Sequence, residues 1–188
     1  MFLKLAIIKI CYHPYPKFAL IIMNIFVTSN CPKLSAQALD NKRVVKMVLE
    51  TAQLLSTAIF INSTITYDNL YKPTHIKHPC TIWAAANIEN WDWLFGHFIA
   101  LYEEYSFRYN KQHASEKISA YLLKYRTDIK SGSMTAFANC TRSEALQIDF
   151  KHIQDTCEAY KKYLIAKWHY DKLPPKWINR EPPPWYNQ

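Results

Sequence analysis

Apolar residues recur every three or four positions along most of this chain, a spacing that places them on one face of an α-helix. The strongest such pattern predicts a helix from Ser35 to Ile59, with Ser35 as its N-cap. Its buried face is expected to consist of Val45, Val48, Ala52, Leu55 and Ile59. Further helices are predicted over Cys80 to Asn87, Asn90 to Tyr109, His113 to Ile129 and Phe150 to Trp168. Only Asn24 to Thr28 has the character of a short strand, so the sequence predicts an all-α fold.

The predicted helices are joined by long connections. Asn62 to Pro79 has no clear period and is interpreted as a loop. The C-terminal segment contains Pro174-Pro175 and Pro182-Pro183-Pro184, which cannot lie inside a helix. Because 188 residues suit one domain, we expect residues 23–188 to form a compact single-domain helical bundle with long loops and a Pro/Trp-rich C-terminal tail.

The start of the chain contains two apolar stretches, Leu5 to Ile8 and Phe18 to Val27. Neither reaches the roughly 18 to 20 apolar residues that cross a bilayer, so no membrane partner is expected. Phe18 to Val27 has the length of a signal-peptide core, but no A-x-A-like cleavage site follows it. The interpretation we prefer takes Met23 as the natural start and residues 1–22 as an upstream extension or leader.

Composition excludes some functions and favours others. The chain has only 2 glycines, which disfavours the Gly-rich loops of P-loop and dinucleotide-binding proteins. Its 23 Lys and Arg against 15 Asp and Glu give a formal charge of +8, which favours a polyanionic partner, nucleic acid first. The alternative is a charge that only prevents aggregation. The 5 cysteines are widely spaced without a C-x-x-C, so we expect an intracellular, reducing compartment and no secretion.

One acid lies among bases on the first predicted helix. Arg43, Lys46, Glu50 and Gln53 follow the three-to-four spacing and therefore share a face. Such a face can hold the Glu50 carboxylate against a sugar carbon that develops positive charge, while Arg43 and Lys46 hold the flanking phosphates. The alternative is a solvated face with an ordinary Lys46–Glu50 pair.

A cationic loop precedes the helix predicted from Cys80. Its phosphate-binding candidates are Lys72, His75, Lys77 and His78. A zinc site is the sharper hypothesis, and its ligands would be His75, His78 and Cys80, with Cys31 or Cys140 as a distant fourth. That spacing matches no standard zinc site, so the sequence assigns no metal. The simplest alternative is a surface loop with a helix cap.

Aromatic residues alternate with cations in the tail, at Lys167-Trp168, Lys176-Trp177, Arg180 and Pro184-Trp185. This pattern suits a strap over the domain that also touches DNA, and simple packing of the tail is the alternative. Trp83, together with Trp91 or Trp93, is assigned mainly to core packing.

Several motifs after residue 22 carry a resemblance. The first are Met23-Asn24-Ile25-Phe26-Val27-Thr28-Ser29, Ala38-Leu39-Asp40-Asn41-Lys42-Arg43-Val44-Val45-Lys46 and Leu49-Glu50. Later ones are Tyr71-Lys72-Pro73-Thr74-His75, His78-Pro79-Cys80, Phe137-Ala138-Asn139-Cys140-Thr141 and Pro183-Pro184-Trp185. In these motifs the chain resembles the pyrimidine dimer DNA glycosylases, the endonuclease V-like repair enzymes, and among them a phage-type subset.

The resemblance implies a compact all-α DNA glycosylase with an AP lyase step, acting on damaged or modified pyrimidines. In that family an N-terminal α-amine attacks the sugar and forms a Schiff base, and a glutamate on the first long helix supports the chemistry. Glu50 matches that glutamate. Met23 would carry the amine, because the bulky Asn24 disfavours removal of the methionine. If Met1 is the true start, Lys46 or Lys42 would replace the amine through a depressed pKa.

We therefore expect a monomer that binds double-stranded DNA, needs no cofactor, and holds a flipped base among aromatic and His-bearing loops. The expected catalytic residues are Glu50, Met23 and Lys46. The expected DNA-binding residues are Lys42, Arg43, Lys72, His75, Lys77, His78, Arg108, Lys167 and Arg180. Two alternatives stay open: a non-catalytic DNA-binding accessory protein, and an enzyme that acts on a modified or free nucleotide.

Overall fold

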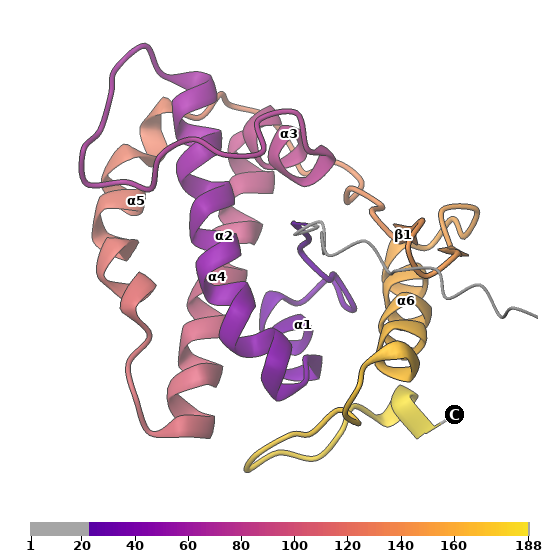
Figure 1. Ribbon diagram of the computed structural model, residues 1–188. Coiled ribbons are helices and arrows are strands. Elements are labelled where there is room, and N and C mark those ends of the chain that lie inside the picture. The colour runs from indigo at the N-terminus through magenta and orange to yellow at the C-terminus, as the bar shows by residue number, and fades with distance from the viewer. Residues whose placement is uncertain (1–22, 188) are drawn as a thin grey trace, which may run out of the picture.

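The computed structural model describes residues 23–187, and the predicted all-α fold is confirmed (Figure 1). Its α-helices are α1 (Pro32–Ala38), α2 (Asn41–Asn62), α3 (Pro79–Ala86), α4 (Ile88–Tyr109), α5 (Ser119–Tyr125) and α6 (Thr156–Tyr170). Short 3-10 turns are η1 (Ala114–Ile118), η2 (Arg126–Asp128) and η3 (Pro184–Asn187). Within the described residues, the only strands are β1 (Arg142–Ser143) and β2 (Ile148–Asp149), which pair antiparallel. The predicted leader, residues 1–22, lies outside the described part.

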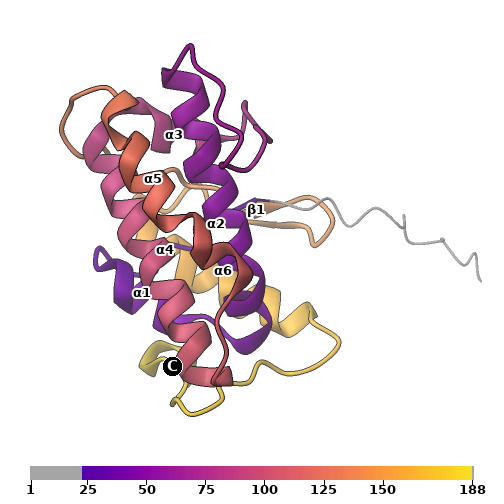
Figure 2. The same cartoon turned by 90° about the vertical axis from the view of Figure 1, so that its left-hand side faces the viewer.

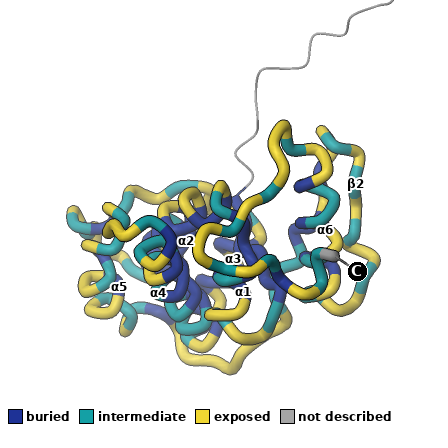
Figure 3. The backbone as a smooth tube through the Cα atoms, turned by 90° about the horizontal axis from the view of Figure 1, so that it is seen from below, coloured by how far each residue is buried: buried dark blue, intermediate teal, exposed yellow. Residues whose placement is uncertain are grey.

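The two 22-residue helices, α2 and α4, form the centre of the molecule. They run side by side, α3 packs on both, and α5 lies on their outer side (Figures 1 and 2). Figure 3 shows the buried residues gathered where α1 to α4 meet. Val48, Ala52, Leu55 and Ile59 of α2 are fully buried as predicted, whereas Val45 is 42% exposed. Trp83 and Trp91 are buried in this core, which confirms their assignment to packing.

The helix predicted from Ser35 to Ile59 is two helices. The chain turns at Leu39 and Asp40, whose extended backbones end α1 and begin α2. Leu39 is fully buried at this corner, so burial of one apolar side chain accompanies the break in the helix. Ser35 is not the N-cap, because its hydroxyl oxygen accepts hydrogen bonds from the amides of Thr28 and Ser29 at 3.2 and 3.1 Å. Pro32 opens α1 instead.

Residues 23–28 are buried but do not form the predicted strand. The side chain of Asn24 accepts hydrogen bonds from the amides of Ile25 and Phe26, at 2.8 and 3.2 Å, and so replaces strand partners. Phe26 has a left-handed backbone, with φ 42°, and its ring contacts Tyr160 and Tyr163 of α6. The segment thus fills the space between the α2–α4 pair and α6, as Figure 1 shows.

Two other predicted helices have different bounds. His113 to Ile129 is divided among η1, α5 and η2, and Phe150 to Trp168 is shortened to α6. Asp155 sets the start of α6, because its carboxylate accepts hydrogen bonds from the amides of Cys157 and Glu158 at 2.8 and 3.2 Å. The residues before Asp155 form β2 and a turn, which sequence periodicity did not indicate.

The Pro/Trp-rich tail packs against the junction of α1 and α2. The Asn41 amide, at the first turn of α2, donates to the Lys176 carbonyl at 2.8 Å. Trp177 donates its indole N–H to the Ala38 carbonyl at 3.1 Å. The rings of Trp177, Trp185 and Tyr186 surround Trp168 of α6, at 5.2 to 5.6 Å between centroids. Packing of the tail on the domain is therefore confirmed, and its contact with DNA stays a prediction.

In the described part, α2 alone is long and apolar enough to span a bilayer, by length and composition. In this fold 67% of its apolar window is buried inside the protein, so α2 serves as a core helix.

Candidate active site and nucleic-acid interface

Glu50 is a buried carboxylate in the middle of α2. It is 4% exposed, so the helix face is not solvated at Glu50, whereas the Lys46–Glu50 pair of that alternative is present. Lys46, one turn earlier, places its Nζ 2.8 Å from Oε1, but no described residue donates a well-oriented hydrogen bond to either oxygen. Buried carboxylates are normally hydrogen-bonded, because desolvating an unpaired charge costs several kcal/mol. A buried carboxylate with one ion pair and no well-oriented hydrogen bond keeps the capacity to accept a ligand.

Four cations, Lys42, Arg43, Lys46 and Lys167, form a basic cluster where α2 and α6 meet. Burial, and then the positive charges of Arg43, Lys46 and Lys42, lower the pKa of Lys167, which shows that the four side chains share one electrostatic environment. Asp171 neutralises part of it, with Lys42 Nζ at 2.8 Å and Arg43 at 3.0 Å. Partial burial raises the pKa of Asp171, but its hydrogen bonds to these cations lower it overall. The cluster retains a net positive charge beside Glu50.

The loop from Tyr71 to His78 is attached to the Glu50 face of α2. The Thr74 amide donates to the hydroxyl of Thr57 at 3.1 Å. Thr57 follows Glu50 by seven residues, which is two helical turns, so both side chains lie on the same face about 10 Å apart along the axis. Lys72, His75 and Lys77 are exposed on this loop. The loop is therefore attached to α2 two turns beyond Glu50, whereas the basic cluster lies before Glu50, at the start of the helix.

A family model described as pyrimidine dimer DNA glycosylase matches residues 23–117. The chain belongs to this family. The matched range contains Glu50, the cationic loop and three of the four cations of the basic cluster, and Lys167 lies beyond it. No curated protein and no solved structure matches the chain. Membership makes the protein a DNA repair glycosylase in general terms, with DNA as its substrate.

Three arginines expected at the interface of this glycosylase are engaged inside the protein. Arg43 is 6% exposed, pairs with Asp40 at 2.8 Å, and lies over the Trp168 ring at 5.9 Å. Arg108 is buried, and its Nε donates to Glu104 at 2.8 Å. Arg180 brings the tail onto the same carboxylate, with Nη2 at 2.7 Å from Glu104. These contacts join α2, α4, α6 and the tail, and DNA contact by these arginines stays a prediction.

Met23, which is expected to carry the amine of the glycosylase, is buried at 1% exposure. The next side chain, Asn24, donates to the Cys140 carbonyl at 3.3 Å. Ile25 lies close to the Cys80 thiol, at the start of α3. Met23 thus begins the described chain inside the core, close to the start of α3.

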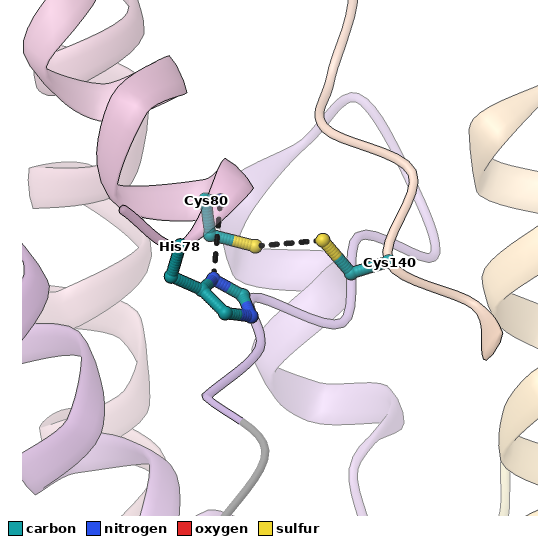
Figure 4. A group of neighbouring side chains, drawn as sticks. All are labelled: His78, Cys80 and Cys140. Atoms are coloured by element: carbon teal, nitrogen blue, oxygen red, sulfur yellow. Dashed lines mark hydrogen bonds between the residues drawn. The ribbon is translucent and has the colours of Figure 1, made fainter. Parts of the chain in front are cut away.

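The structure brings together three of the residues that the zinc hypothesis named as ligands. His78, Cys80 and Cys140 lie with their ligand atoms all within 4.8 Å of one another, as Figure 4 shows. His75 and Cys31 are not in the group. The Cys80 thiol donates to the Cys140 sulfur at 3.6 Å, and this bond lowers the pKa of Cys140 while raising that of Cys80. Burial, and then the charge of His75, lower the pKa of His78, whose Nδ1 accepts from the Cys80 amide at 3.2 Å.

Sequence reasoning missed the acids that organise these cations. Asp40, Glu104 and Asp171 hold Arg43, Arg108, Arg180 and Lys42. Asp171 lies 128 residues from Arg43, so no local spacing could indicate the pair. Thr57, the anchor of the cationic loop, was also missed, although it continues the three-to-four spacing of Glu50 and Gln53.

Proposed function

We propose that this protein is a DNA glycosylase with an associated AP lyase step that removes damaged or modified pyrimidines from double-stranded DNA. The observation that carries the proposal is the Glu50 carboxylate, which is buried with only Lys46 as its charge partner, without a well-oriented hydrogen bond, on the helix that carries most of the basic cluster. A phosphate backbone complements such a surface, and the carboxylate complements a sugar that develops positive charge.

In the proposed reaction a neutral amine attacks the sugar C1′ of the damaged nucleotide. The glycosidic bond breaks, its electron pair leaves with the base, and the base takes up a proton. The amine-bound sugar opens to a Schiff base, from which the strand is cleaved. Glu50 stabilises the positive charge on the sugar. The α-amine of Met23 is the proposed nucleophile, because an α-amine with a pKa of about 8 is partly neutral near pH 7. Lys46, beside Glu50, is the alternative if the leader is retained.

The proposed phosphate contacts are the cations that face solvent. On the basic cluster these are Lys42 and Lys46, whose side chains are 69% and 51% exposed, together with the partly buried Lys167. On the cationic loop they are Lys72, His75 and Lys77. His78, Arg43, Arg108 and Arg180 are proposed to position these elements as well as to approach DNA. We further propose a monomer that acts inside the cell and belongs to the phage-type subset.

Borohydride trapping tests the proposal directly. The full-length protein is incubated with ultraviolet-irradiated duplex and with undamaged duplex, and the Schiff base is reduced to a stable adduct. We expect an adduct with the irradiated duplex, and none with Glu50→Gln. Glu103→Gln, an exposed carboxylate on α4, is the matched control and should be trapped like the wild type. Peptide mass spectrometry then identifies the linked residue as Met23 or Lys46.

The alternatives give other results. Salt-sensitive DNA binding without an adduct or base release would identify an accessory protein. Absence of binding to either duplex at physiological salt would favour an enzyme that acts on a free or modified nucleotide.

A further inference from the structure

The group formed by His78, Cys80 and Cys140 joins two distant parts of the chain. His78 and Cys80 lie at the start of α3, whereas Cys140 lies 60 residues from Cys80, in the extended segment that precedes β1. Cys80 is fully buried, Cys140 is 9% exposed, and His78 is half-buried. Figure 4 shows the two sulfurs facing each other, with the imidazole beside them and its Nδ1 joined to the Cys80 amide. The chemical steps proposed above use neither cysteine, and His78 enters that proposal only as a positioning and DNA-approaching residue.

The spacing of the donor atoms suits a tetrahedral zinc ion. With Zn–S bonds of about 2.3 Å and a tetrahedral angle, two thiolate ligands lie about 3.8 Å apart. The Cys80 and Cys140 sulfurs are 3.6 Å apart, and the His78 ligand atom is within 4.8 Å of both. Soft thiolates with an imidazole are a donor set that selects zinc over magnesium or calcium. Small side-chain movements would therefore complete three of four ligand positions.

The surroundings fix both sulfur ligands. The Cys80 amide donates to His78 Nδ1 at 3.2 Å at the first turn of α3, which holds the backbone that carries the Cys80 sulfur. Tyr160 of α6 accepts a hydrogen bond from the Cys140 amide at 3.2 Å and donates to the Ala138 carbonyl at 2.9 Å, which holds the segment that carries Cys140. Outer contacts of this kind orient the ligands of a metal site.

We propose that His78, Cys80 and Cys140 bind one zinc ion, which ties the start of α3 to the segment before β1, with water as the fourth ligand. Binding releases the two thiol protons to solvent. It also requires the imidazole lone pair that now accepts from the Cys80 amide, so the metal replaces this cap of α3. The sequence spacing matched no standard zinc site because the third ligand comes from so far along the chain.

Cobalt titration of the reduced, metal-stripped full chain tests the site. We expect one equivalent of Co²⁺ to produce thiolate charge-transfer absorption and tetrahedral visible bands, and one equivalent of Zn²⁺ to abolish them. His78→Asn removes a ligand but keeps a good helix N-cap, and it should weaken binding at least tenfold. Its matched control, His75→Asn, should bind like the wild type. Cys80→Ser and Cys140→Ser should lose the charge-transfer bands, and Cys31→Ser should keep them.

A second readout covers variants that fold poorly. Added Zn²⁺ should raise the thermal midpoint of the wild type and of His75→Asn, but not that of His78→Asn. The proposal is overturned if cobalt gives no thiolate bands, if Cys31→Ser loses them, or if His78→Asn binds unchanged. Recovery of Cys80 and Cys140 as a disulfide from protein purified with zinc present would overturn it too. Because metal binding is measured without DNA, failure here leaves the proposed glycosylase activity untouched.

Discussion

At the residue scale, the most informative side chain is Glu50. Its surroundings differ from those of Glu104, another buried carboxylate of this protein. Glu104 holds two guanidinium groups, whereas Glu50 has only the flexible, half-exposed Lys46. Burial of an incompletely paired carboxylate lowers the free energy of unfolding. Residues that destabilise a fold in this way are retained where function requires them.

Glu50→Gln is therefore expected to separate stability from activity. The amide keeps the shape and removes the desolvated charge, so the free energy of unfolding should rise by about 1 kcal/mol. Loss of charge stabilisation in the transition state should lower the rate of base release at least about 100-fold. Urea unfolding and single-turnover assays measure the two effects. A variant that is both inactive and less stable would indicate an ordinary structural ion pair.

His97 gives this protein a defined sensitivity to acid. It is fully buried on α4, its Nδ1 lies 3.0 Å from the Pro32 carbonyl of α1, and burial lowers its pKa from 6.5 to about 4. In the unfolded chain His97 therefore binds a proton below pH 6.5, whereas in the folded protein it does so only below about pH 4. The fold with a neutral His97 is fully stable, with respect to this group, above pH 6.5. That stability is lost as the pH falls toward 4.

We expect wild-type stability to fall by about 3 kcal/mol more than that of His97→Gln between pH 7 and pH 4. Chemical denaturation across this pH range measures the difference between the two slopes. His169→Gln, at an exposed histidine, is the control and should keep the wild-type slope. Parallel curves for wild type and His97→Gln would show that His97 is not the acid-sensitive group.

At the element scale, ion pairs determine how the helices meet. Glu104 on α4 binds Arg108 of its own helix and Arg180 of the tail, while Arg108 also donates to Asn41 of α2 and the Gln37 carbonyl of α1 at 3.1 Å. The Glu104 carboxylate thus pairs with the two arginines through which three helices and the tail are connected. Periodicity predicted the apolar face of α2, because that face repeats locally, but it could not indicate partners that lie far along the chain.

Removing this charge should loosen the connection. Glu104→Gln leaves the buried Arg108 guanidinium without its counter-ion and is expected to lower the free energy of unfolding by about 3 kcal/mol. Glu103→Gln, at the exposed neighbouring position, should change it by less than about 0.5 kcal/mol. Thermal or urea unfolding distinguishes the two. Equal stability of both variants would contradict the role assigned to Glu104.

The sequence predicted which residues of the site share a helix face, but not which of them the fold buries. The shared face of Arg43, Lys46 and Glu50 followed from helical spacing, and the structure keeps it on α2. Burial of Glu50 could not be foreseen, since it depends on the packing of elements that are distant in sequence. The break at Leu39 and Asp40 was missed because no glycine or proline between Ser35 and Ile59 marks it.

At the scale of the whole molecule, the exposed cations form the proposed DNA-binding face. Removing one lysine that neutralises a phosphate should reduce the slope of log affinity against log salt by about 0.9. Lys72→Gln combined with Lys77→Gln should therefore lower the slope by about 2, measured by fluorescence anisotropy on duplex DNA at several salt concentrations. Lys124→Gln, an exposed lysine on α5, should leave the slope unchanged. An unchanged slope in the double variant would place the phosphates elsewhere.

The tail has a consequence for biosynthesis. In the first turn of α2, the Asn41 amide donates a hydrogen bond to the Lys176 carbonyl. The Asn41 side chain accepts one from the Ile178 amide at 3.0 Å, a contact across 137 residues. While the chain is being made on the ribosome, the helix that bears Glu50 emerges long before these partners exist. During that interval the first turn of α2 lacks its hydrogen bonds to the tail, so chaperones that bind nascent chains would have access to it. The contacts between the tail and α2 therefore form only after synthesis has passed residue 178.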